Sequence, residues 1–523
     1  MDRICKYFAL LVVLILSSCT SKAERQETKE QPNILFILSD DHTSQAWGIY
    51  GGILADYVQN KNIEKLASEG VVLNNAFCTN SICTPSRGSI LTGQYSHINQ
   101  VYTLNEPLPR NHPNIARTLS ENGYQTAVIG KWHLVGKPEG FDYYNVLPGQ
   151  GRYWDPILKT AGNWIDGGNS TTGQQYKGFS TDVITDLTID YLKERDKKKP
   201  FLMFCNFKAT HEPFDYPERF KHLYEGVDIP EPESLLDFDK ENSGRTFHGQ
   251  TLERLGKRWD NATQNPDKFW TSYPGLPYPL EGLDSIQKRK RIYQKLVKDF
   301  MRCGAAIDDN IGKLLDFLEA TGIADNTIVV YTADQGYFLG EHGFFDKRMI
   351  YEESLRMPFV IRYPKKIKGG QRLDDIILNI DFAALIADYA GVAKPAYIQG
   401  QSFRGNLEGN TPKDWRKQMY YRYWLHHPDR PAHFGVRNER YKLAFFYGQD
   451  LGMKGTSKEM TDPVWEFFDL HKDPKELNNA YGEAEYAPII SEMKMAIQEE
   501  RKKYGDNDTK YDEMQSILAK AFK

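Results

Sequence analysis

Short, continuous apolar runs recur along the chain between residues 32 and 364. They do not alternate apolar with polar residues, and a strand that is covered on both faces has this continuous pattern. Such strands are typical of a parallel sheet between two helix layers. The runs predict five strands: NILFILS (33–39), QTAVIG (125–130), PFLMFCNF (200–207), NTIVVYT (326–332) and MPFVIRYP (357–364).

Helical patterns separate these runs. NIEKLASEG (62–70) and IARTLSENG (115–123) each end at a glycine, which suits a helix C-terminus. The longest pattern covers residues 285–321 and carries apolar residues at three-four spacing. The alternation predicts an α/β catalytic domain over residues 32–395, with a mostly parallel central sheet between helix layers.

Two regions depart from this alternation. Residues 212–282 are rich in Pro, Trp, Tyr and acidic residues with weak periodicity, which predicts a long insertion over the sheet. Residues 400–523 predict a smaller α+β subdomain with an antiparallel sheet that has alternating faces, closed by a charged helix over 483–504. Its predicted strands are QMYYRYWL (418–425), FGVRNERYKLAFFYG (434–448) and VWEFFDL (464–470).

The N-terminus reads as a targeting segment. An apolar run, FALLVVLILS, follows Arg3 and Lys6 and is too short for a permanent membrane span. LSSC (16–19) resembles a bacterial lipobox, which predicts removal of residues 1–18, lipidation of Cys19 and a flexible tether over 19–31. We therefore expect a bacterial lipoprotein of the periplasm or the outer membrane and cell surface, which touches the membrane through its lipid only. The alternative is an ordinary secretory signal with an incidental Cys19.

Composition narrows the class of partner. The chain has 523 residues, of which 40% are hydrophobic and 26% charged, which is ordinary for a globular protein. The formal net charge of -4 lacks the basic excess of nucleic-acid-binding proteins, so we expect no nucleic-acid partner.

Four cysteines lie beyond the targeting segment: Cys78, Cys83, Cys205 and Cys303. They lack CxxC spacing, so the sequence indicates neither a zinc site nor a disulfide framework. Cys205 and Cys303 fall in apolar patterns and are expected in the core. Cys83 is expected in a loop, and a disulfide with Cys78 is its main structural alternative.

Four of the predicted strands end in unusual polar residues. Each cluster alone has a structural explanation as a helix cap or a turn. In an open α/β sheet, however, ligands bind outside the carboxyl ends of the strands, so all four clusters are expected at one edge. They are Asp40-Asp41-His42, Lys131-Trp132-His133, Lys208 with His211, and Asp334-Gln335-Gly336.

The residue types at this edge predict a metal beside an anion. Asp40, Asp41 and Asp334 would repel one another, and a hard divalent cation, Ca²⁺ or Mg²⁺, would relieve the repulsion. Gln335 adds an amide oxygen. Arg87, Lys131, His133 and Lys347 form a cationic set, which together with a metal predicts a site for a tetrahedral oxyanion, sulfate or phosphate.

Several segments resemble one family. CTPSRGSILTG (83–93) resembles CxPxRxxxLTG, the signature of the type I, formylglycine-dependent sulfatases of the alkaline phosphatase superfamily. The resemblance extends over nearly the whole mature chain and points to bacterial lipoprotein glycan sulfatases. The other segments that carry it are NILFILSDDH (33–42), GYQTAVIGKWHL (123–134), YTADQGYFLGEHG (331–343), FFDKRMIYEESLRMPFVIRYP (344–364) and FFDLHKDPKELNN (467–479).

The resemblance implies a role for each site residue. Cys83 would be oxidised to formylglycine (3-oxoalanine) by a formylglycine-generating or anaerobic sulfatase-maturating enzyme. Its hydrated aldehyde would offer one hydroxyl to attack sulfur and a second to expel sulfate. One Ca²⁺ ion would be held by Asp40, Asp41, Asp334, Gln335 and the group derived from Cys83.

The remaining roles concern the anion and the leaving group. Arg87 would steady the formylglycine, and His133 would contact its hydroxyl. Lys131 and Lys347 would bind sulfate oxygens, and His211 would protonate the leaving sugar oxygen. Two departures stand out: Gln335 replaces the His or Asn of many members, and GKWHLVG is one residue longer than GKWHLG.

We therefore expect a sulfatase that hydrolyses sulfate esters of carbohydrates, such as sulfated glycans, glycosaminoglycans or mucin-type saccharides. A 4- or 6-O-sulfated galactose or N-acetylhexosamine is the favoured substrate. Lys208, Arg422, His426 and His427 are candidate sugar contacts, with a solvated lysine and a surface loop as the equally weighted alternatives.

Two other functions stay open on the sequence. A phosphonate or phosphate monoester hydrolase can use the same scaffold and the same modified cysteine, and relative turnover of sulfate and phosphonate esters would distinguish it. A non-catalytic glycan-binding lipoprotein would be marked by loss of catalytic residues or by an unmodified Cys83.

Overall fold

The structure is a computed structural model that describes residues 31–164, 172–237, 248–268 and 272–523. Residues Pro32–Lys523 form one compact unit. The predicted signal peptide (1–18), Cys19 and nearly all of the tether (19–31) lie outside the described residues. Within the described ranges, no helix has the length and apolarity that a membrane crossing requires.

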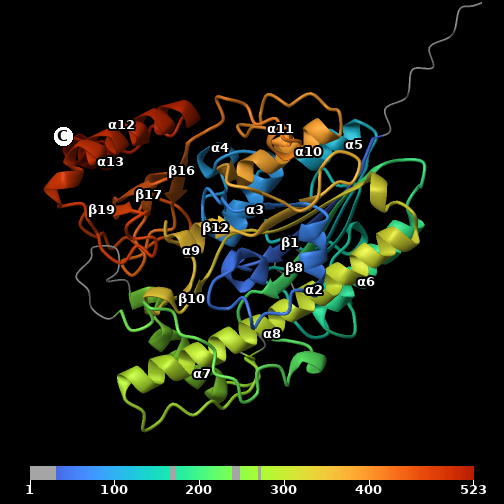
Figure 1. Cartoon of the computed structure of the whole chain (residues 1–523), viewed down its shortest axis with the longest axis horizontal. Coiled ribbons are helices and arrows are strands. Elements are labelled where there is room, and N and C mark those ends of the chain that lie inside the picture. The colour runs from blue at the N-terminus through green and yellow to red at the C-terminus, as the bar shows by residue number, and fades with distance from the viewer. Residues whose placement is uncertain (1–30, 165–171, 238–247, 269–271) are drawn as a thin grey trace, which may run out of the picture. The chain divides into compact units, whose positions relative to one another are not determined.

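The centre of this unit is an eight-stranded sheet with the order β14-β2-β13-β9-β1-β8-β4-β5 (Figure 1). Neighbouring strands are parallel, except that β13 runs antiparallel to both β9 and β2. The strands are β1 (Asn33–Asp40), β2 (Val71–Leu73), β4 (Gln125–Lys131), β5 (Tyr143–Leu147), β8 (Phe201–Thr210), β9 (Thr327–Ala333), β13 (Phe359–Arg362) and β14 (Gln371–Leu373).

The predicted fold class is confirmed, with one local difference. The run 357–364 forms only a short strand, β13, and it is the antiparallel member of the sheet. Met357 belongs instead to β12 (Arg356–Met357), in a three-stranded sheet with the order β12-β3-β15. The apolar run alone does not encode strand direction, which the chain's connections decide.

Helices cover both faces of the sheet, because side chains of a strand point alternately to its two sides. Along β1, Ile34, Phe36 and Leu38 enter one core and Leu35 and Ile37 enter the other. The first core includes residues of α3 (Cys83–Thr92), α5 (Ile115–Glu121) and α10 (Phe382–Tyr389). The second includes residues of α2 (Lys61–Ser68), α6 (Ser180–Glu194) and α8 (Ser285–Ala320).

The insertion over 212–282 is more regular than expected. It contains α7 (Leu252–Gln264), which packs on α8. Leu252, Leu255, Trp259 and Ala262 bury the apolar side of this helix. Their three-four spacing was a helix signal in the sequence, surrounded by residues that favour loops.

The C-terminal strands form a consecutive antiparallel sheet of β16 (Gln418–Tyr423), β17 (His433–Asn438), β18 (Tyr441–Phe446) and β19 (Val464–Asp469). The predicted strand 434–448 is therefore a hairpin of two strands. Alternating faces were also wrong, because five consecutive residues are buried in each of β16, β17 and β18. The predicted last helix is α12 (Ala487–Tyr504), and α13 (Asp512–Ala521) follows it. The division into 32–395 and 400–523 stays a prediction.

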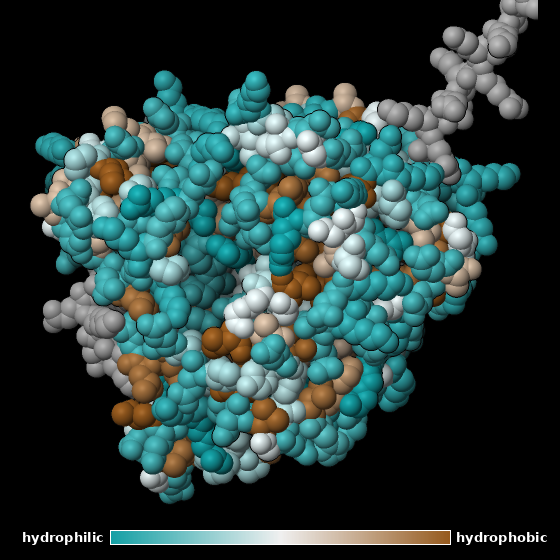
Figure 2. Space-filling view, viewed as in Figure 1, coloured by the Kyte–Doolittle hydropathy of each residue, from teal (hydrophilic) through white to brown (hydrophobic). Residues whose placement is uncertain are grey.

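The remaining elements are short. They are β3 (Ala76–Phe77), β6 (Ile157–Leu158), β7 (Gln174–Gln175), β10 (Phe338–Leu339), β11 (Phe345–Asp346), β15 (Ile377–Leu378), α4 (Ser96–Asn99), α9 (Glu352–Leu355), α11 (Arg404–Leu407) and the 3₁₀ turns η1 (Ser44–Ala46), η2 (Gly48–Tyr50), η3 (Ala161–Asn163), η4 (Glu218–Phe220), η5 (His248–Gln250), η7 (Ala324–Asn326), η8 (Glu341–Gly343), η9 (Asn379–Asp381) and η10 (Ala484–Tyr486). On the face shown in Figure 2, hydrophilic residues predominate and hydrophobic ones are scattered.

Gly130 controls how closely β4 approaches β8 near the end of both strands. It pairs with Asn206, has a φ of +101°, and a Cβ added there would lie 2.0 Å from the Asn206 carbonyl oxygen. Gly123 has a similar φ of +89° with nothing within 4 Å of such a Cβ.

Gly123→Ala should therefore lower the unfolding free energy by about 1 kcal/mol, the cost of holding alanine in the left-handed backbone conformation. Gly130→Ala should cost about 1–3 kcal/mol more in unfolding free energy, because the two backbones must also separate. Urea unfolding measures both, and equal costs would contradict the close approach.

Candidate active site

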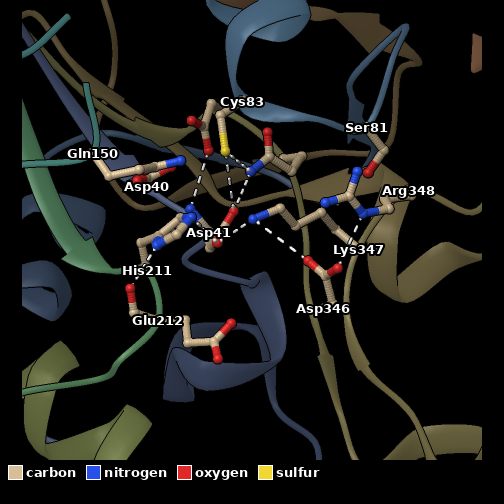
Figure 3. A network of polar contacts seen from close by, with 12 residues as sticks. Asp40, Asp41, Ser81, Cys83, Gln150, His211, Glu212, Asp346, Lys347 and Arg348 are labelled. Atoms are coloured by element: carbon tan, nitrogen blue, oxygen red, sulfur yellow. Dashed lines mark hydrogen bonds and ion pairs between the residues drawn. The ribbon is translucent and has the colours of Figure 1, made fainter. Parts of the chain in front are cut away.

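The four predicted clusters meet at one edge of the central sheet. Asp40 ends β1, Lys131 ends β4, and Asp334 directly follows β9. His211 follows β8, and Cys83 is the first residue of α3 above the same edge (Figure 3). Parallel strands thus bring together residues that lie far apart in the sequence.

Three buried carboxylates form the centre of the site. One oxygen from each of Asp40, Asp41 and Asp334 lies within 4.8 Å of the others. Asp41 has a φ of 65°, in the left-handed region, and its backbone N–H donates to Asp334 Oδ1 at 3.1 Å. Strained backbone of this kind is common where a side chain must be aimed at a functional site.

The pKa values of the three crowded carboxyl groups shift in opposite directions. Burial raises the pKa of Asp41 to about 6, against the opposing charge of Lys347. Burial and the negative charge of Asp40 raise the pKa of Asp334 to about 7. Burial also disfavours the charged form of Asp40, but the charges of Lys131 and Arg87 hold its pKa well below the usual range. Such opposed shifts indicate carboxylates that lack enough positive charge.

Two lysines contact this cluster, each through a different carboxylate. Lys131 Nζ pairs with Asp40 and donates to Gln150 Oε1 at 2.5 Å. Lys347 Nζ lies 2.5 Å from Asp41 Oδ2 and 3.6 Å from Asp346 Oδ1. Burial works against the charged form of Lys347, but Asp41 holds its pKa well above the usual range. Both lysines are therefore fixed as buried cations at the predicted anion site.

Arg87 ties three strand ends together. Its Nε donates to Asp334 Oδ2 at 2.8 Å and one Nη donates to the Lys131 carbonyl at 2.8 Å. Its other Nη lies 3.7 Å from Asp40 Oδ1. A planar guanidinium suits this role, because its donors diverge in a fixed geometry.

Cys83 lies in a helix, not in the loop that we expected. It is 1% exposed, and its Sγ is 3.8 Å from Asp41 Oδ1 and 3.7 Å from Gln335 Nε2. Burial and the charge of Asp40 raise the pKa of the Cys83 thiol well above its usual range. All four described cysteines are free thiols, so the Cys78–Cys83 disulfide does not form, and Cys205 and Cys303 are buried as expected.

The donor set fits a hard cation. Asp40 Oδ1 and Gln335 Oε1 are buried, and neither has a hydrogen-bond partner among the described residues. The Gln335 amide nitrogen donates to Asp41. Buried polar atoms are normally satisfied, so these two orphaned oxygens beside three carboxylates have the chemistry of a Ca²⁺ or Mg²⁺ site.

Two histidines flank this cluster. His133 has a φ of 56°, and burial together with Lys131 holds its pKa well below the usual range. His211 Nδ1 lies 2.7 Å from the Glu212 carbonyl, and its Nε2 lies 3.8 Å from Asp41 Oδ2. Because a carbonyl only accepts, Nδ1 carries the proton, and Nε2 of the neutral ring faces the site with a lone pair.

A cavity of about 690 Å³ opens beside His211. It is lined by residues of the strand ends and of the insertion, among them Gln150, Tyr153, Trp154, Lys208, His211 and Arg258. Lys208, predicted as a possible sugar contact, thus lies in this cavity. The cavity adjoins the cluster of carboxylates and lysines, because two of its lining residues contact that cluster: Gln150 contacts Lys131, and His211 lies near Asp41.

The other predicted sugar contacts lie elsewhere. Arg422 is 1% exposed and pairs with Asp506 at 2.6 Å and Asp508 at 2.9 Å, so its position does not support a sugar contact. His426 is buried and contacts the Glu459 carbonyl through Nε2 at 2.8 Å. The His427 side chain is 44% exposed and lies 3.7 Å from Asp429. Neither histidine lines the cavity beside His211 among the residues that the structure describes.

Sequence reasoning missed three residues in this network. Gln150 contacts Lys131, and Asp346 and Arg348 flank Lys347 with left-handed φ values of 77° and 100° (Figure 3). The Arg348 Nε donates to Asp346 at 3.0 Å. For Asp346 and Arg348, the sequence offered one signal, their adjacency to Lys347. For Gln150 it offered none, because this residue lies in a loop without a recognisable motif.

Tyr421 of the C-terminal sheet braces two of these segments. Its hydroxyl donates to the Arg348 carbonyl at 2.6 Å and accepts from the Ser81 N–H at 3.3 Å. Arg348 follows Lys347, and Ser81 precedes Cys83. The C-terminal sheet therefore supports the backbone of both segments, and the hydroxyl of its Tyr423 also accepts a hydrogen bond from Arg348 at 3.2 Å.

Known proteins are similar to this chain in sequence and in fold. The family described as Sulfatase matches residues 32–392, and the family described as N-sulphoglucosamine sulphohydrolase, C-terminal, matches residues 340–503. An N-acetylglucosamine-6-O-sulfatase of Bacteroides thetaiotaomicron is 38% identical over 98% of this chain and 92% of its own length.

Two solved structures illustrate the range of the fold. A protein in complex with its substrate D-glucosamine-2-N,6-O-disulfate has a TM-score of 0.82 and 36% identity, over 92% of this chain and 100% of that chain. A phosphonate monoester hydrolase of Silicibacter pomeroyi has a TM-score of 0.67 over 91% of this chain and 96% of its own. At 22% identity, the latter shows a shared fold alone.

The raised pKa of Asp334 predicts how stability depends on pH without metal. Its folded pKa of about 7 exceeds the unfolded value of about 4, so the folded state holds an extra proton at pH 5 and loses that advantage as pH rises through 7. With a chelator present, wild type should lose about 2 kcal/mol more stability than Asp334→Asn between pH 5 and pH 8. Urea unfolding at the two pH values measures this difference. Asp190→Asn, at an exposed helix position, is the control, and parallel pH profiles for wild type and Asp334→Asn would refute the shift.

Proposed function

Because this chain belongs to the sulfatase family, we propose that it hydrolyses the 6-O-sulfate ester of N-acetylglucosamine or N-sulfated glucosamine in sulfated glycans. Its class, a sulfuric ester hydrolase, follows from the family. The convergence of Cys83, three carboxylates and two lysines in one buried cluster is the observation that carries the proposal. The sugar and the position follow the relative that is similar over 98% of this chain.

The proposed 6-O-sulfated glucosamine is a narrower substrate class than the sequence alone predicted. A 4- or 6-O-sulfated galactose or N-acetylhexosamine was favoured there, and the relative acts at position 6 of N-acetylglucosamine by its name. The solved similar structure contains a glucosamine with both N- and 6-O-sulfates. We therefore place N-acetylglucosamine 6-sulfate first and the disulfate second.

We assign the sulfate to the gap between Lys131 and Lys347. These ammonium groups pair with Asp40 and Asp41 in this structure, so each already lies beside the carboxylate cluster. Charge-assisted hydrogen bonds from two sides would orient a sulfate and stabilise the charge that develops on its oxygens. Arg87 holds Asp334 and the end of β4 in place for this arrangement.

Asp40, Asp41, Asp334 and Gln335 would hold one Ca²⁺ ion, with the group derived from Cys83 as a further ligand. When bound, the ion supplies positive charge next to the reacting sulfate and to the nucleophile. It would also satisfy the orphaned oxygens of Asp40 and Gln335.

Cys83 is proposed as the precursor of the nucleophile. Its pKa is raised well above the usual range, so the thiol would not ionise near neutral pH as a cysteine nucleophile must. Oxidation to formylglycine by a maturation enzyme would supply a hydrated aldehyde, with one hydroxyl for attack on sulfur and one for release of sulfate. Pro85 and Arg87 complete the segment that such an enzyme would read.

His211 is proposed as the general acid. Its Nδ1 donates to the Glu212 carbonyl, and burial together with Lys131 lowers its pKa, so the resting ring is neutral. To act as an acid, the ring must take up a second proton on Nε2, the atom that faces the site. That proton can pass to the sugar oxygen as the ester bond breaks. Because the cavity opens beside His211, the leaving sugar would occupy it, with Asp346 and Arg348 as further polar groups near the sulfate.

The amino-terminal segment would hold the enzyme outside the cytoplasm. Lipidation of Cys19 would anchor it in the periplasm or at the outer membrane and cell surface, where sulfated glycans from outside are met. Its partners would then be the glycan and, before export, the maturation enzyme.

The substrate proposal is tested on a panel of saccharides. Purified enzyme with Cys83 conversion verified by mass spectrometry should release sulfate fastest from N-acetylglucosamine 6-sulfate. It should act at least tenfold more slowly on galactose 4- and 6-sulfates, because differences of one polar contact are worth about that factor. Phenylphosphonate tests the phosphonate hydrolase alternative, and faster phosphonate turnover would replace the proposal.

The matched control for this panel is Cys83→Ser. It should lose sulfatase turnover while keeping its unfolding temperature and its stabilisation by added Ca²⁺, because the four oxygen-bearing ligands are untouched. Full activity of this variant, or of a preparation with an unmodified thiol throughout, would contradict the formylglycine assignment.

The role of His211 predicts a dependence on the leaving group. A sugar alkoxide leaves poorly and needs a proton, whereas nitrophenolate leaves without help. His211→Ala should therefore lower kcat by about 100- to 10,000-fold on N-acetylglucosamine 6-sulfate and far less on p-nitrophenyl sulfate. His222→Ala, at an exposed histidine outside the cavity, is the control. Equal losses on both substrates would exclude general-acid catalysis by this residue.

A further inference from the structure

Lys208 is a buried cation in the cavity beside His211. It lies near the end of β8, is 2% exposed, and lines the cavity together with Gln150 and His211. Cys83, Lys131 and Lys347 are not among the described residues that line this cavity. Lys208 therefore serves the space for the sugar rather than the gap between the two sulfate-binding lysines.

No carboxylate of the described residues lies within ion-pair distance of Lys208. Its ammonium instead lies 4.7 Å from the centre of the Tyr153 ring. Burial, and then the charge of Lys131, lower the pKa of Lys208 to about 8. A buried ammonium that has only an aromatic face as partner is costly, because a cation–π contact replaces little of its lost hydration.

Neither of the acidic residues that line the described cavity, Glu212 and Asp215, pairs with Lys208. Glu212 pairs with Arg258 at 2.5 Å and accepts from the Tyr273 hydroxyl. Asp215 accepts from the Tyr216 N–H at 2.8 Å. The positive charge of Lys208 thus stays uncompensated within the described part of the cavity, which suits a negatively charged ligand group.

The same cavity presents aromatic surface. Trp154 is 43% exposed and lines it beside Tyr153, over which Lys208 lies. Aromatic faces combine apolar contact with polar edges, which suits sugar rings. A charged substituent on a saccharide in this cavity would share the space that Lys208 lines.

We propose that Lys208 forms a second anion subsite, which binds a sulfate or carboxylate of the substrate other than the scissile 6-O-sulfate. This inference rests on the proposed function and extends it from one charged group to two. The second anion could be the N-sulfate of the same glucosamine or the carboxylate of a neighbouring uronic acid. Both present oxygens to a single ammonium, and the substrates below distinguish them.

The test compares substrates with one and two anionic groups. They are N-acetylglucosamine 6-sulfate, glucosamine-2-N,6-O-disulfate, and N-acetylglucosamine 6-sulfate linked to glucuronic acid. In Lys208→Met, the ratio of kcat/KM for one doubly charged substrate to that for the singly charged one should fall tenfold or more, mainly through KM. A charge-assisted hydrogen bond is worth about this factor or more. Lys208→Arg should restore part of the ratio.

The substrate that loses its advantage identifies the source of the anion. Lys177→Met, at a lysine that is 89% exposed, is the control and should keep both ratios. Unchanged ratios for both doubly charged substrates in Lys208→Met would overturn the proposal. If wild type turned over none of the three substrates, the proposed function itself would fail, which is a different outcome.

A measurement on wild type covers the case in which Lys208→Met does not fold. Glucosamine N-sulfate and glucuronic-acid-linked N-acetylglucosamine both lack the 6-sulfate. At least one of them should inhibit tenfold more strongly than N-acetylglucosamine, and the inhibition should weaken with added salt. If neither inhibits better than the neutral sugar, the second anion subsite does not exist.

Discussion

Mutual repulsion among Asp40, Asp41 and Asp334 is the constraint on which the rest of this structure depends. The parallel topology places all three at one edge, in a buried position where their charges are poorly screened. Arg87, Lys131 and Lys347 offset part of this repulsion with their positive charges, and a divalent cation would offset the rest. In the proposed function, the same charges that hold the carboxylates together are the charges that an incoming sulfate would meet. Stability and chemistry therefore rest on one set of groups.

Much of this arrangement could be predicted from the sequence because it follows from strand ends. Continuous apolar runs predicted a mostly parallel sheet. Because parallel strands end at the same edge, the polar residues after β1, β4, β8 and β9 were expected to lie together there. What could not be predicted depends on contacts distant in sequence. Arg422 reads as an exposed basic residue until its partner Asp506, 84 positions away, is known. Gln150 reaches Lys131 from a loop that no periodic pattern describes.

The C-terminal sheet shows how support and chemistry are divided. Its strands are buried on both sides, so they carry few groups that could face a ligand. Tyr421 nevertheless contacts the backbone at two places, at the residue after Lys347 and two residues before Cys83. The precision of the polar groups thus depends on packing by a part of the chain that does not touch the carboxylates.

The burial of Cys83 sets an order of events in the life of the molecule. At 1% exposure, on the first turn of α3 at the carboxyl edge of the sheet, its sulfur is closed to another protein once the core has formed. On the proposed role of Cys83, conversion to formylglycine would have to precede closure of the core, so maturation and folding would compete for each new chain. A chain that folded first would keep its thiol, and the active fraction of a preparation would then record the outcome of that competition rather than the stability of the enzyme.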